Sequence, residues 1–86
     1  MVLNLSRVNF MHANLAEANL NGANLSEAHL EYAYLWKATL QGANMRGTYL
    51  SHTNLQDADM TGADLTGAEF DKTVMPDIGS QDKKGF

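Results

Sequence analysis

The sequence has no cysteine, few aromatic residues and no long apolar run. The absence of cysteine excludes disulfides, thiol catalysis and cysteine-ligated metals. No stretch approaches the roughly 20 apolar residues of a membrane-spanning helix, and Met1 is not followed by the basic segment and apolar run of a signal peptide. We therefore expect a cytoplasmic protein with no membrane partner.

Clustered basic side chains are also missing. Six Lys and Arg stand against ten Asp and Glu, which gives a formal net charge of −4. Proteins that bind nucleic acids contact the phosphates with grouped Lys and Arg side chains. The composition therefore predicts no nucleic-acid partner.

What the sequence does contain is a repeat of five residues. Every fifth position from Leu5 to Met75 is apolar: ten are Leu, three are Met and two are Phe. A step of five residues rotates successive apolar groups by about 140° on an α-helix and sends them to opposite faces of a strand. No straight element can bury them together, so we expect a solenoid that coils around its own apolar side chains.

The other positions of the repeat fit a solenoid. Ala stands two residues before the apolar position in ten units, which suits a crowded interior. Asn or Asp stands directly before it in nine of fifteen units, and those side chains hydrogen-bond nearby backbone in tight turns. The last position, where the chain must change direction, holds five glycines: Gly22, Gly42, Gly47, Gly62 and Gly67.

Units such as Ala13-Asn14-Leu15-Ala16-Glu17 and Ala63-Asp64-Leu65-Thr66-Gly67 resemble the pentapeptide-repeat family, whose unit is Ala-(Asn/Asp)-Leu-X-X. The resemblance covers Leu3 to about Asp77. It implies an all-β fold, a right-handed quadrilateral parallel β-helix with four units per coil and about four coils, in which residues twenty apart stack. We predict one β-helix domain over residues 1–77 and a mobile tail over 78–86.

The outward positions are least regular between His29 and Tyr49, where aromatic residues enter the repeat. On the coil that the resemblance implies, Tyr32, Tyr34 and Trp36 lie around one corner. His12 and His52 stack on either side of Tyr32, and His29 lies below Tyr49 nearby. Exposed aromatic clusters are enriched at binding surfaces, but stacked rings also stabilise adjacent strands. Both interpretations stay open. We name these residues the aromatic patch and treat them as a candidate partner-binding surface: His29, Tyr32, Tyr34, Trp36 and Tyr49.

Acidic residues gather toward the end of the repeat and form a second candidate, the acidic band: Asp57, Asp59, Asp64, Glu69 and Asp71. Some members of the family resemble duplex DNA in width and charge and occupy the DNA-binding saddle of DNA gyrase. The resemblance therefore implies one alternative function, a DNA-mimicking modulator of gyrase. The simpler interpretation is a solvated acidic face that keeps the protein soluble.

No motif for chemistry stands out. His12 and His52 are expected two coils apart, about 9 to 10 Å at the spacing of neighbouring strands, which is too far for one metal ion. No nucleophile, base and acid come together in a pocket. We predict no enzyme activity and no catalytic, cofactor or metal site.

The function that the sequence favours is a rigid scaffold for a protein partner, and the family resemblance implies a bacterial source. The ends of such a coil carry unpaired strand edges, which favour an end-to-end homodimer. A structural spacer with self-association only is the other alternative.

Overall fold

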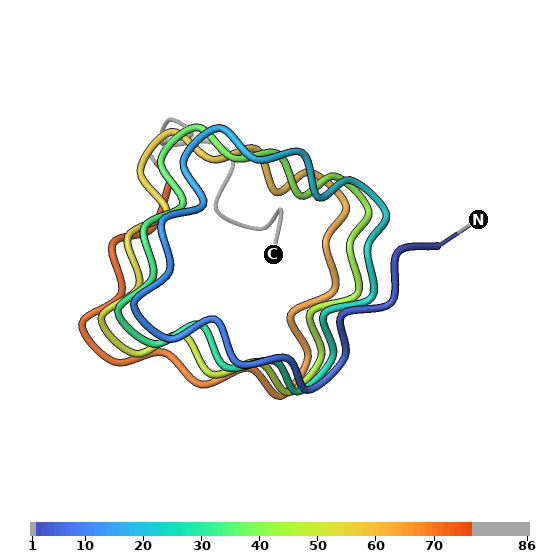
Figure 1. Ribbon diagram of the computed structural model, residues 1–86, viewed down its shortest axis with the longest axis horizontal. Helices are drawn as coiled ribbons and strands as arrows, with labels where there is room; N and C mark the ends of the chain where they lie inside the picture. Colours follow the sequence, from blue (N-terminus) through green and yellow to red (C-terminus); the bar gives the residue numbers. More distant parts are fainter. Residues whose placement is uncertain (1, 77–86) are drawn as a thin grey trace.

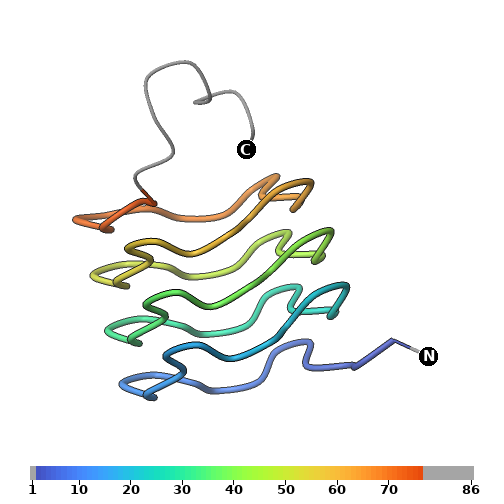
Figure 2. The ribbon, with the colours of Figure 1, turned by 90° about the horizontal axis from the view of Figure 1, so that it is seen from above.

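The structure is a computed structural model that describes residues 2–76, so the predicted tail over 78–86 and the predicted boundary at Asp77 lie outside the described residues. The chain winds as a four-sided coil (Figure 1), and successive coils stack directly on one another (Figure 2). All bridges between the coils are parallel. The predicted fold, a right-handed quadrilateral parallel β-helix of about four coils, is confirmed.

Residues 2–76 contain no helix and no strand longer than a single bridged residue. The bridged residues stand at the middle of each side, and each pairs with the residue twenty positions later, as Tyr34 does with Asn54. Two kinds of backbone hydrogen bond hold the coils together. The Tyr34 N–H donates to the Ala13 carbonyl below at 2.9 Å, and the Leu35 N–H donates to the Asn54 carbonyl above at 2.8 Å. The stacking of residues twenty apart is therefore confirmed.

The sides are joined by four-residue turns. In one of them the Ala33 N–H donates to the Leu30 carbonyl at 3.0 Å, and Tyr32, the third residue, has a φ of 63°. A positive φ at the third residue alone is the mark of a type II turn. Five glycines and nine other residues take this conformation in the described chain. Glycine adopts it without strain, whereas another residue adopts it at a cost of about 1 to 2 kcal/mol.

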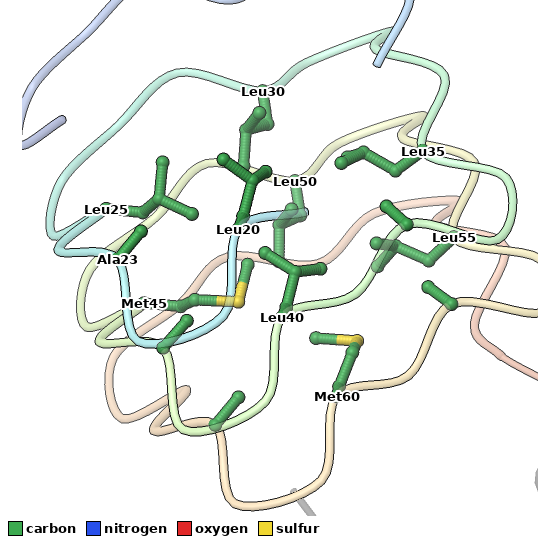
Figure 3. Close-up of a cluster of buried hydrophobic side chains, with 14 of the residues drawn as sticks. Leu20, Ala23, Leu25, Leu30, Leu35, Leu40, Met45, Leu50, Leu55 and Met60 are labelled. Atoms are coloured by element: carbon green, nitrogen blue, oxygen red, sulfur yellow. The ribbon is translucent and has the colours of Figure 1, made fainter. Parts of the chain in front are cut away.

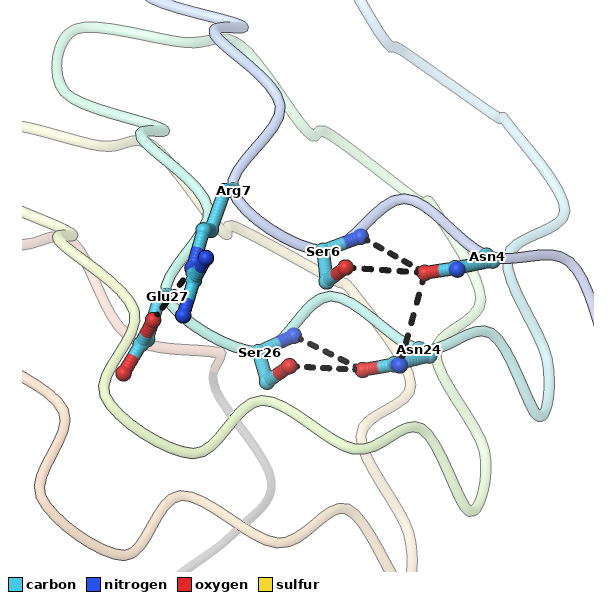
Figure 4. A network of polar contacts seen from close by, with 6 residues as sticks. All are labelled: Asn4, Ser6, Arg7, Asn24, Ser26 and Glu27. Atoms are coloured by element: carbon cyan, nitrogen blue, oxygen red, sulfur yellow. Dashed lines mark hydrogen bonds and ion pairs between the residues drawn. The ribbon is translucent and has the colours of Figure 1, made fainter.

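The Asn and Asp side chains cap these turns. Asn24 Oδ1 accepts hydrogen bonds from the Ser26 N–H at 3.1 Å and from the Ser26 hydroxyl at 2.8 Å (Figure 4). The Asn24 amide group also donates to Asn4 Oδ1 in the coil below, at 3.4 Å. A bond from the side-chain oxygen to the N–H two residues later confirms the predicted role at all nine positions: Asn4, Asn9, Asn14, Asn19, Asn24, Asn44, Asn54, Asp59 and Asp64.

The interior is a column of apolar side chains without a second layer (Figure 3). The apolar positions of the middle coils, including Leu30, Leu35 and Leu50, have no solvent exposure. Thr53 occupies an interior position in place of Ala, and its hydroxyl donates to the Leu30 carbonyl at 2.6 Å, so the buried polar group is satisfied. The inward residues of the first coil, such as Leu5, are only partly buried because a neighbouring coil covers them on one side alone.

Candidate interaction surface

The aromatic patch occupies one complete side of the coil and part of the side that precedes it. Tyr32 stands at one corner, Tyr34 at the bridged middle of the following side, and Trp36 at the next corner. These three rings therefore extend along a side from corner to corner instead of surrounding one corner, as the sequence had suggested. His29 and Tyr49 are bridged to each other on the preceding side. Tyr32 and Tyr34 are 51% and 41% exposed.

Three rings at the corner of Tyr32 form a ladder along the solenoid axis. The centroid of the Tyr32 ring lies 5.0 Å from that of His12 and 4.6 Å from that of His52, with interplanar angles of 12° and 3°. We call His12, Tyr32 and His52 the histidine–tyrosine ladder. Its order is the one predicted from the register of twenty residues, which brings positions 12, 32 and 52 into one column.

A second stack lies on the preceding side. The His29 and Tyr49 rings are 4.4 Å apart between centroids and almost parallel, at 8°. His29 Nδ1 is also 3.3 Å from Glu31 Oε2, and the other oxygen of Glu31 is buried without a hydrogen-bond partner among the described residues. Glu31 is therefore the carboxylate that contacts His29 within the chain.

Sequence reasoning missed two exposed apolar side chains beside the patch. Met11 is 43% exposed and stands next to His12 at the same corner, and Val74 is 49% exposed in the column of Tyr34. Met11 could have been found by extending the column of Tyr32 by one position, and Val74 by extending the column of Tyr34 by two coils. They enlarge the apolar area on the side that carries the aromatic patch.

The patch residues replace residues that cap the turns. His29, Tyr34 and Tyr49 stand where the repeat elsewhere places Asn or Asp. As a result, the Trp36 N–H, two residues after Tyr34, has no hydrogen-bond partner among the described residues. At Thr39 the loss is repaired, because Asn21 Oδ1 in the coil below accepts from the Gln41 N–H at 2.8 Å. No such repair occurs after Tyr34.

The ladder also occupies strained backbone positions. His12, Tyr32 and His52 have φ values of 65°, 63° and 60°. Other corners place glycine at the same point, for example Gly22 and Gly42. The aromatic rings therefore stand where the fold itself favours glycine.

The acidic band encircles the rod instead of running along it. Asp59, Asp64 and Glu69 stand at the bridged middles of three successive sides. The hydroxyl of Thr61 lowers the pKa of Asp59, and the hydroxyl of Thr66 lowers the pKa of Asp64, because each donates a hydrogen bond to the carboxylate. Asp64 is also 3.1 Å from Arg46, so part of its charge is neutralised.

The described residues contain no cluster of side chains that could hold a metal ion. Within 2–76, no three His, Asp or Glu side chains lie close enough together to hold a metal ion, and Tyr32 fills the space between His12 and His52. No helix in this range could cross a membrane. An open groove of about 740 Å³ follows the corner of Gly47 and Gly67, but its serine and threonine hydroxyls are already bonded to turn-capping side chains.

Comparison with known proteins agrees with this architecture. The model of the family described as pentapeptide repeats matches the chain in eight copies, over residues 4–42, 28–67 and 43–75. No curated protein sequence matches. A crystal structure of a pentapeptide repeat protein from the cyanobacterium Cyanothece 51142 is 35% identical over 84% of this chain and 53% of its own, with a TM-score of 0.45.

Two further solved structures come from Nostoc PCC 7120. One pentapeptide repeat protein is 31% identical over 95% of this chain and 81% of its own, with a TM-score of 0.48. The other, HetL, is involved in the regulation of heterocyst differentiation, and it is 33% identical over 88% of this chain and 42% of its own, with a TM-score of 0.42. This chain thus spans only about half of the Cyanothece protein and less than half of HetL. The repeat match over residues 4–75, together with the four-sided coil, shows that the chain belongs to the pentapeptide repeat family.

Proposed function

We propose that this protein is a non-enzymatic, rigid scaffold that binds a protein partner through the aromatic patch, in the cytoplasm of a bacterium. The observation that carries the proposal is that the patch replaces residues that stabilise the fold. Tyr34 removes a turn cap and stacks on no other ring among the described residues. Tyr32 stands at a positive φ that glycine takes without strain.

A purely structural ladder accounts poorly for these features. Stacked rings stabilise neighbouring strands by about 0.2 to 1 kcal/mol per pair, which is offset by the strained φ and by the missing caps. Tyrosine and tryptophan are, however, the residues most enriched among the energetic anchors of protein interfaces. A rigid coil presents such rings in a preset geometry, so little conformational entropy is lost on binding.

The first test is site-specific photocrosslinking in a lysate of the source organism. We expect a benzoylphenylalanine at position 34 to crosslink one partner protein, because position 34 lies in the patch. The same probe at position 41, an exposed corner away from the patch, is the control and should not capture that partner. Equal capture at both positions, or none at 34, would overturn the assignment of the patch.

Modulation of DNA gyrase remains a separate proposal, and the shape of the acidic band weighs against it. A DNA mimic needs charge along its length, whereas Asp59, Asp64 and Glu69 encircle one coil. We expect saturating protein to leave gyrase supercoiling unchanged. Inhibition in that assay would favour the mimic over the scaffold.

End-to-end pairing of two copies is compatible with the scaffold. The bridged residues Asn9, Asn14 and Asn19 of the first coil have backbone N–H groups without a partner among the described residues, above inward side chains that are only partly buried. Unpaired edges of this kind favour pairing with another chain. Light scattering over a dilution series should show a mass that falls from dimer to monomer, and a constant monomer mass would exclude the pairing.

A further inference from the structure

Tyr32, the middle ring of the histidine–tyrosine ladder, presents its edge and not its faces to a partner. Both faces of Tyr32 are covered, by His12 at 5.0 Å and by His52 at 4.6 Å, with planes within 12° of parallel. Nothing can therefore stack on Tyr32, which excludes the ring-on-ring contacts by which nucleobases bind to aromatic side chains. What remains accessible of Tyr32 is the edge of its ring, and the residue is 51% exposed.

Aromatic edges are electropositive, whereas the faces carry negative charge. In this ladder the edges also bear the imidazole N–H groups and the phenol O–H, which are hydrogen-bond donors. A column of positive edges and donors fits carboxylates. It does not fit cations, which bind over ring faces.

Protonation would strengthen this preference. Histidine is the side chain that gains a charge between about pH 5 and 8, and all three histidines of the chain are stacked on tyrosines. A charged imidazole over a tyrosine face makes a favourable cation–π contact. Full protonation of the three histidines would add three positive charges to the formal net charge of −4 and leave −1.

The three histidines differ in the charged groups that surround them. His29 Nδ1 lies 3.3 Å from Glu31 Oε2, and Glu69 follows Tyr49 in the column of His29. A positive charge on His29 would therefore be balanced by carboxylates of the same chain. No ion pair involves His12 or His52 among the described residues. Asp71 and Lys72 stand at the same corner in the coil above His52, and the Asp71 carbonyl accepts a hydrogen bond from the His52 backbone N–H. The formal charges of Asp71 and Lys72 cancel.

We propose that the aromatic patch docks an acidic, Asp- or Glu-rich segment of the partner protein, and that protonation of His12 and His52 strengthens this docking. The inference rests on the proposed function, because the ladder shares Tyr32 with the patch. Binding should be weaker near pH 8 than near pH 5.5, because protonated His12 and His52 would place positive charge at the ladder itself and reduce the net negative charge of the chain.

The test uses a fluorescein-labelled octaglutamate peptide and fluorescence anisotropy with the full chain at low salt. We expect the dissociation constant to be at least about tenfold lower at pH 5.5 than at pH 8. The His12→Asn/His52→Asn variant should lose this difference, and asparagine suits these positions because it tolerates a positive φ. Gln41→Ser, at an exposed corner outside the aromatic patch, is the control and should keep the difference.

Binding that does not depend on pH, or that is unchanged in His12→Asn/His52→Asn, would overturn the inference, as would no binding at pH 5.5. An octalysine peptide should not bind more tightly at the lower pH. Melting temperatures of the variants at both pH values check that the coil stays folded. If a partner crosslinks at position 34 with an affinity that is independent of pH, the scaffold proposal stands and only acid recognition fails. If nothing crosslinks there, the scaffold proposal fails whatever the peptide result.

Discussion

Replacing Leu35 by Ala is expected to lower the free energy of unfolding by about 2 to 5 kcal/mol, the range for removing a buried leucine side chain. Leu35 lies in the second coil with no solvent exposure. The interior consists only of the inward side chains of the four sides, such as Leu30, Leu40 and Leu55, so truncation of Leu35 leaves a cavity among them. For a chain of this size, each kcal/mol lowers the melting temperature by about 4 to 8 °C. Thermal unfolding followed by circular dichroism measures the shift.

The matched control is Leu5→Ala, which makes the same chemical change in the first coil. Leu5 is only partly buried because a neighbouring coil covers it on one side. Its replacement should therefore lower the melting temperature clearly less than Leu35→Ala does. Equal effects at the two positions would contradict a stability that builds up from contacts between neighbouring coils.

Partner binding should fall by at least about 30-fold when the patch is rewritten in the residues that the repeat itself favours, because the loss of one anchor residue already accounts for about 2 kcal/mol. The variant is Tyr32→Gly, Tyr34→Asn and Trp36→Ser. Its melting temperature should not decrease. Asparagine at position 34 would restore a turn cap worth about 1 kcal/mol, and glycine at position 32 would relieve the strained φ at a similar gain. These gains offset the two lost ring stacks.

This variant is informative because its affinity for the partner should fall while its melting temperature should not. The affinity is measured by titration of the crosslinked partner once it is purified, and Gln41→Ser, at an exposed corner away from the patch, is the control that should bind normally. A melting temperature lowered by about 10 °C or more, on the order of 2 kcal/mol, would mean that the rings are structural ladder residues. Unchanged affinity would mean that the partner binds elsewhere on the coil.

Much of the fold could be predicted because each five-residue unit contains the residues that determine the local path of the chain. An apolar residue at every fifth position excludes a straight helix or strand, and Asn or Asp directly before it caps the turn, as all nine such residues do. The number of sides was not contained in the period of five. It came from the family resemblance, and the bridges between residues twenty apart confirm it.

The candidate site was predicted less completely, because its properties arise between coils. The sequence indicated that His12, Tyr32 and His52 share a column, but not that their planes would lie within 12° of parallel and cover both faces of Tyr32. It located the acidic residues near the end of the repeat, but not their distribution around the coil.

By itself, then, the sequence determined the coiled path of the chain, since the inward apolar residues and the turn caps act within five residues of one another. Only the tertiary structure decided what the surface offers to a partner. Whether a ring shows its face or its edge, and whether a missing cap is repaired from below as at Gln41 or left open as at Trp36, depends on side chains twenty positions away. Stacking of the coils is what brings those side chains into contact.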